Sequence, residues 1–282
     1  MVKIFDVSAG PKSISEAHDA TSIWELAKEE YPADRISHYF YLISYVIVAY
    51  GFAHLLIHLM CKGCNKRYLK LNKKKQGEYR ATIISFIHSI ICVLFATAAM
   101  FYVCGDGQSV FNNEHCLETP RYLHIWALVN SCGYFIADTF NIVVIIGTFD
   151  VYDKQMIGHH VIATVTFMGT LAFMNFAVVF GVMLLFVEVS TPFISLRWIL
   201  YTHKQHRSTC HVINAIMVFF TFLLGRLVFQ IGILFGIGYP KLIDMFQDET
   251  LPWYKVSLVI IMFISITISA LMNLFWMYLI VH

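Results

Sequence analysis

Charged side chains are scarce in this chain of 282 residues. Asp, Glu, Lys and Arg together make up 13% of the sequence, whereas hydrophobic residues make up 58%. Soluble domains carry about a quarter charged residues, so the composition argues against a soluble domain and places the chain among membrane proteins. The formal net charge is +2, and so small an excess gives no reason to expect nucleic acid as a partner.

The long hydrophobic runs also lack the alternation of polar and apolar residues that marks the strands of a membrane barrel. In a bilayer only helices and closed barrels satisfy the backbone, and about 20 apolar residues cross it as a helix. We therefore predict an all-α polytopic membrane helical bundle with about seven transmembrane helices. The seven runs are 39–60, 81–103, 122–147, 157–173, 176–200, 212–238 and 254–281.

Two places in these runs leave the helix geometry open. Only Met174 and Asn175 separate the fourth run from the fifth, which predicts either a tight helical hairpin or one long bent element. In the fifth run, Pro192 follows Ser190 and Thr191. Because proline lacks a backbone donor, we expect a kink there, with the two hydroxyls satisfying the freed carbonyls.

The start of the chain has no apolar core and is rich in acidic residues, a pattern that predicts neither a cleavable signal nor a transit peptide. Ser22 and Glu25 have the spacing of a capping box. A short helix is therefore expected through Trp24, on the membrane surface, ending before Pro32. We assign residues 1–38 to an extramembrane segment that contains this helix.

The loops between the runs divide by charge. Loops 61–80 and 201–211 are dense in Lys, Arg and His, whereas loops 104–121 and 239–253 are acidic on balance. Basic loops face the cytosol or its equivalent. Alternation across seven spans therefore predicts an N-terminus on the outside and a C-terminus on the inside.

The cysteines suggest at most one bridge. Cys104 and Cys116 share one outer loop, so a disulfide between them is one interpretation. Cys61 and Cys64 form a CxxC after His58, but a zinc site needs four suitably spaced ligands and no second pair follows. We predict no metal there and regard palmitoylation as the alternative.

Ionisable side chains inside the apolar runs are the candidate functional residues, because each costs several kcal/mol in lipid and usually faces a protein interior. At about 1.5 Å of rise per residue, their predicted depths below the basic side increase from about 5 Å to about 22 Å. In order of depth they are His159 with His160, His88, Asp138, Glu188 and Arg226, and the first run adds His54 and His58. We expect one polar column from five helices.

Simpler interpretations exist for several of these residues. Glu188 and Arg226 are a candidate ion pair that would hold two helices in register. The two histidines near the end of the first run are more simply helix–helix hydrogen-bond partners. His159 and His160 point about 100° apart on one helix, so only one of them can face the bundle centre.

Four stretches in order resemble the TLC-domain proteins, a family named for TRAM, Lag1 and a neuronal lipofuscinosis protein. "YRATIISFIHS" resembles its opening arginine and helix-borne histidine, and "GYFIADT" its aromatic–Asp signature. "DKQMIGHHVIAT" resembles the Asp–His-His–Thr core of the Lag1 motif, and "EVSTPFISLRWIL" is closest to the lipid-regulator branch. The resemblance covers roughly residues 75–280. We accordingly assign 39–74 to a first transmembrane helix with its basic loop, and 75–282 to a TLC domain with a six-helix core.

In the ceramide-synthase branch the twin histidines act in acyl transfer from acyl-CoA to a sphingoid amine. The resemblance implies such a catalytic role for His159 and His160, with Asp138 beside them. The later acidic part of that motif and the homeobox-like segment are absent from this chain. Lipid handling of the lipid-regulator branch is therefore the closer expectation, with lipid-binding roles for His88, Thr164, Glu188 and Arg226.

The resulting hypothesis is a lipid-handling membrane protein, an acyltransferase that takes acyl-CoA as co-substrate and needs no bound cofactor. Its basic loop would attract CoA phosphates or anionic lipid head groups. The alternative is that the loop only sets the orientation of the protein in the membrane. The alternatives are a non-catalytic lipid-binding protein, an accessory subunit of a larger membrane complex, and, less favoured, a transporter or receptor. The endoplasmic reticulum is the expected compartment, with a mitochondrial membrane as the alternative.

Overall fold

The computed structural model describes residues 23–32, 36–105, 107–147, 150–173, 175–247 and 251–281. Over these residues the chain is a bundle of helices, with a single isolated β-bridge between Glu30 and Arg121. Seven helical stretches are long and apolar enough to cross a membrane, which confirms the predicted fold class. The predicted capping residue Ser22 lies outside the described part of the chain.

The first half of the bundle contains two long spans, α2 and α3, and a third span that ends in a π-helical turn. Its elements are α1 (Ile23–Lys28), α2 (Ile36–Cys64), η1 (Tyr68–Lys70), α3 (Lys73–Phe101), α4 (Glu114–Glu118), α5 (Tyr122–Phe140) and η2 (Asn141–Ile146).

The second half begins with a helical hairpin and ends with two long spans. Its elements are α6 (Val151–Phe173), α7 (Phe176–Leu185), η3 (Phe186–Ser190), α8 (Thr191–Thr202), α9 (Thr209–Thr221), η4 (Phe222–Phe229), α10 (Gln230–Ile233), η5 (Leu234–Gly238), α11 (Tyr239–Gln247) and α12 (Trp253–Val281).

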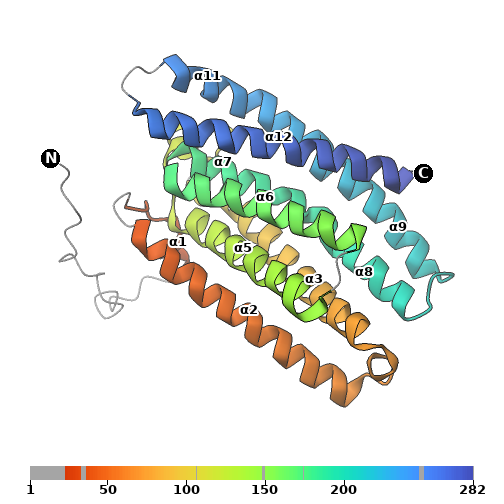
Figure 1. The fold of residues 1–282 in the computed structure, drawn as a ribbon. Coiled ribbons are helices and arrows are strands. Elements are labelled where there is room, and N and C mark those ends of the chain that lie inside the picture. Colours follow the sequence, from red (N-terminus) through yellow and green to blue (C-terminus); the bar gives the residue numbers. More distant parts are fainter. Residues whose placement is uncertain are drawn as a thin grey trace.

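Helix α7 is the core of the bundle, because every one of its residues is buried. A helix that is apolar all round is typical of a fully enclosed position. It packs against α3, α5 and α6, and α6 in turn packs against α5 and α12. Figure 1 shows α2 at one edge of the bundle, and α9 and α12 at the other.

The junction of the fourth and fifth spans is a hairpin, so the bent-helix alternative is wrong. Helices α6 and α7 run in opposite directions and pack together. Asn175, which precedes α7, has a φ of 49°. Asparagine tolerates this left-handed region better than most residues do, so it suits a reversal of this kind.

Contacts between loops show that the two basic loops lie at one end of the bundle and the two acidic loops at the other. On the basic side, Arg67 Nε donates to the Thr202 carbonyl at 2.9 Å. On the acidic side, Lys241 Nζ lies 3.0 Å from Glu114 and 2.6 Å from Glu118. The segment before α2 lies on this acidic side too, because the Tyr31 amide donates to the Pro120 carbonyl. The predicted disulfide between Cys104 and Cys116 is present there.

Pro192 changes the helix as predicted, but the two hydroxyls before it have other partners than expected. It lies in the first turn of α8, and the preceding residues form the 3₁₀ segment η3, because proline cannot donate to an α-helical partner. The Ser190 hydroxyl accepts a hydrogen bond from Arg226 and so does the Thr191 hydroxyl. Both are therefore engaged with this buried cation.

The close approach of α2 and α5 depends on Gly133. A Cβ atom at this position would overlap the side chain of Val46 on α2. By contrast, a Cβ atom at Gly51, on α2 itself, would meet nothing. The two glycines therefore form a matched pair for testing this interface.

We expect Gly133→Ala to destabilise the protein by about 1–3 kcal/mol, because the added methyl group overpacks the α2–α5 interface. Gly51→Ala should be neutral or slightly stabilising, since alanine is the better helix former. Thermal unfolding of the detergent-solubilised variants measures the difference. Equal melting temperatures for the two variants would contradict the interface.

Candidate functional site

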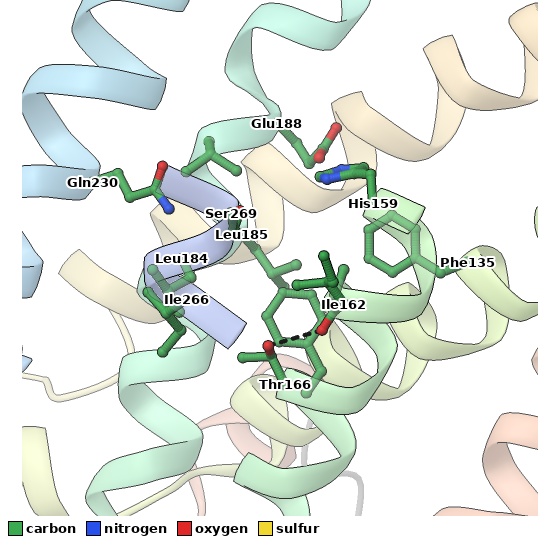
Figure 2. Close-up of a pocket in the computed structure, with 13 residues that line it drawn as sticks. Phe135, His159, Ile162, Thr166, Leu184, Leu185, Glu188, Gln230, Ile266 and Ser269 are labelled. Carbon is green, nitrogen blue, oxygen red and sulfur yellow. Dashed lines mark hydrogen bonds between the residues drawn. The ribbon is translucent and has the colours of Figure 1, made fainter. Parts of the chain in front are cut away.

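A pocket in the interior of the bundle lies between α5, α6, α7, η3, α10 and α12. The volume of the cavity is about 40 Å³. Its polar end is formed by His159 and Glu188, which Figure 2 shows next to each other. Toward the acidic side, the wall continues with Ile162, Leu185 and Ile266. A polar end followed by an apolar wall suits a lipid chain with a polar terminus.

His159 is the histidine of the twin pair that lines the pocket. Its side chain is buried, and its ring meets the ring of Trp276 edge-on at 5.4 Å between centroids. On the other side the ring of Phe135 lies 6.2 Å away. The imidazole is therefore held between two aromatic side chains, with the pocket in front of it.

His160 faces a different neighbour, as the turn of about 100° between successive helical residues requires. Its Nδ1 lies 3.5 Å from Asp138 Oδ2 on α5, and both side chains are buried. The ring of Phe135 lies 5.1 Å from the His160 ring. Asp138 is therefore in a position to act on His160, the histidine that does not line the pocket.

His88 interacts with other side chains inside the bundle and does not line the pocket. Its ring stacks on Tyr134 at 3.7 Å. Its Nδ1 is 2.9 Å from the Tyr50 hydroxyl, and its Nε2 is 3.2 Å from Cys92 Sγ. Because Tyr134 also contacts the ring of His160, one aromatic stack connects His88 with the twin pair.

Glu188 and Arg226 form the ion pair that the sequence suggested. Arg226 Nη2 lies 3.6 Å from Glu188 Oε1, and both side chains are buried, with exposures of 5% for Arg226 and 8% for Glu188. The guanidinium also donates to Ser190 at 2.8 Å and to Thr191 at 2.7 Å. Thr191 in turn donates to Glu188 at 2.6 Å. Buried charges need this combination of pairing and hydrogen bonds.

Aromatic rings cover the remaining faces of the guanidinium. Arg226 Cζ lies 5.3 Å from the Phe222 ring centroid and 5.9 Å from that of Trp276, within range of a cation–π interaction. Trp276 therefore touches both Arg226 and His159. Arg226 lies in the π-helical segment η4, and π-helical turns occur frequently at functional sites.

The predicted column of increasing depth is wrong in its spacing. His159 and Glu188, predicted about 13 Å apart in depth, line the same end of one pocket. Trp276 likewise contacts His159 and Arg226. The offset arises in part because α6 begins at Val151, six residues before the predicted start of this span at 157, so His159 lies deeper in the bundle than expected.

The remaining predicted residues lie outside the pocket. Thr164 is half-buried and does not line it, and the threonine of the pocket wall is Thr166. His58 bonds to the hydroxyl of Tyr68 at 2.7 Å, in agreement with a structural role. His54 is buried.

Sequence reasoning missed several polar and aromatic residues of this region, and four of them bear on its chemistry. Gln230 and Ser269 line the pocket, while Asn273 and Trp276 support its polar end. The available signal was a carboxamide inside each of the last two apolar runs. These amides carry no charge, so a search for ionisable side chains did not select them.

A family model for the TLC domain, shared by TRAM, LAG1 and CLN8 proteins, matches residues 78–282. The match covers well over half of the chain and includes every pocket residue. No curated protein matched the chain in a separate comparison.

We expect Arg226→Met to destabilise the protein by about 3–5 kcal/mol, because it leaves the Glu188 carboxylate buried without its cation. The double variant Glu188→Gln with Arg226→Met should recover part of this loss, since no uncompensated charge remains. Thermal unfolding in detergent is the measurement, with Glu188→Gln alone as the third arm of the cycle. Strict additivity of the two single effects would contradict the ion pair.

Proposed function

The chain belongs to the TLC-domain family and is a membrane lipid-related protein, and from this premise we propose that it transfers acyl groups from acyl-CoA in membrane lipid homeostasis. The observation that supports the proposal is the position of His159. It lies at the polar end of a pocket whose further walls are mostly apolar. A thioester carbonyl bound at this imidazole would have its acyl chain along Ile162 and Ile266.

In the proposed reaction, a ring nitrogen of His159 attacks the thioester carbonyl. The carbon–sulfur bond breaks, and CoA leaves as a thiolate that is protonated from solvent. An amine or hydroxyl of an acceptor lipid then attacks the acyl-imidazole, loses its proton and carries the acyl group away. The Glu188 carboxylate at the same end of the pocket would stabilise positive charge on the ring.

His160 and Asp138 have a positioning role in this proposal. Asp138 contacts His160 and would hold α6 against α5 in the orientation that turns His159 to the pocket. The assignment refines the sequence-based hypothesis, in which Asp138 or either histidine could orient the other. His88 supports the same helices through its stack on Tyr134.

The basic side of the molecule has charge for the phosphates of CoA. Lys74 and Lys75 are engaged with acidic residues. The remaining lysines of the loop make no ion pair with the described residues, so phosphate would not have to displace an internal partner. They are Lys62, Lys66, Lys70 and Lys73. Each basic residue near a surface contributes about 1 kcal/mol toward anionic groups. We propose the endoplasmic reticulum, where acyl-CoA and acceptor lipids meet, as the compartment.

A non-catalytic lipid-binding protein or accessory subunit is the second candidate. The observation in its favour is that the carboxylate at the polar end of the pocket already has a partner within the bundle. Glu188 is neutralised by Arg226, and His88 is bonded to Tyr50. Such a site would bind a lipid without reacting with it.

We expect His159→Ala to lower acyl transfer by at least about 100-fold, because it removes the nucleophile, while the protein remains folded. The assay follows labelled palmitoyl-CoA into lipids by purified protein in liposomes that contain amine and hydroxyl acceptors. His206→Ala, in the exposed basic loop, is the matched control and should keep full activity. Wild-type protein that retains bound lipid but transfers no acyl group would favour the second candidate.

A further inference from the structure

The hydrogen bonds behind the pocket wall fix the orientation of one amide that faces the pocket. Arg226 can only donate, so the atom of Asn273 at 3.3 Å from its Nη1 is the oxygen. The Asn273 nitrogen is therefore left to donate, and it does so to the Gln230 oxygen at 2.8 Å. By elimination, the free end of the Gln230 amide is its nitrogen, a donor.

This donor is buried and directed into the pocket. Gln230 is 2% exposed and lines the cavity together with Ser269. Its amide nitrogen makes no hydrogen bond with any described residue, and Figure 2 shows that nitrogen on the side of the pocket. A buried donor without an acceptor is costly, and more so at membrane depth, where water is absent.

The position of Gln230 relates the donor to the reactive end. It follows Arg226 by one helical turn, about 5–6 Å along the axis, and α9, η4 and α10 run from the basic side toward the acidic side. Arg226 is joined through Trp276 to His159. The donor therefore lies about one helical turn nearer the acidic side than Arg226, which is the direction in which an acyl chain bound at His159 would extend.

We propose that the pocket selects acyl chains that carry an oxygen, a hydroxyl or keto group, within the first few carbons from the reacting carbonyl. Gln230 donates to that oxygen and is the specificity-determining residue. The inference rests on the proposed function, because that function places the carbonyl end of the chain at His159. The apolar wall alone does not distinguish one acyl chain from another, whereas this donor specifies the class of acyl chain.

The test compares neutral probes that differ only in this oxygen. Methyl hexadecanoate and its 2-hydroxy and 3-hydroxy derivatives compete with a photoreactive hexadecanoyl probe for the full-length protein in nanodiscs. We expect at least one hydroxylated ester to bind the wild type about tenfold more tightly than the plain ester, the effect of one good hydrogen bond. Equal binding of all three esters by the wild type would overturn the inference without recourse to any variant.

Two variants locate the effect. In Gln230→Leu the preference should disappear while the plain ester still binds. The matched control, Ile266→Val, removes one methylene from the same pocket and should weaken all three esters equally. A preference that survives in Gln230→Leu would overturn the assignment. The competition experiment measures binding without turnover, so its result does not depend on the result of the acyl-transfer assay. Transfer without the preference refutes only this inference, and the preference without transfer refutes only the proposed enzyme.

Discussion

The burial of the Arg226 guanidinium determines the arrangement of the functional half of the bundle. A cation in the apolar interior requires an anion and hydrogen-bond acceptors at fixed places. Glu188 and the hydroxyls of Ser190 and Thr191, the two residues before Pro192, supply them on one side. Asn273 supplies another acceptor from α12. One side chain thereby holds η3, η4 and α12 together at the polar end of the pocket.

The irregular turn before Pro192 positions the residues that pair with Arg226. Pro192 prevents a regular helix through residues 186–190, and the resulting turn brings Ser190, Thr191 and Glu188 to the same cation. The π-helical segment η4 presents Arg226 from the opposite helix. Irregular helix geometry at membrane depth is tolerated where it is enclosed by protein, as here.

The twin histidines divide the interior into two environments. His159 lines the pocket and contacts Trp276. His160 contacts Asp138 and the aromatic stack that extends to His88. Two adjacent residues on a helix point in different directions, so a bundle that surrounds the helix gives each a different role. One histidine of the pair thus lines the pocket, and the other belongs to a structural polar network.

The sequence by itself determined the membrane class, the seven spans and the division of the loops into basic and acidic sets, because length, hydropathy and loop charge are properties of each segment alone. Only the tertiary structure decided which histidine lines the pocket, that Asp138 meets His160, and that Gln230 presents a donor. These depend on how far each helix is rotated and shifted along its axis against its neighbours. Side-chain packing between helices sets the rotation and the axial shift of each helix. A helix that is apolar on nearly every face gives little indication of either from its sequence.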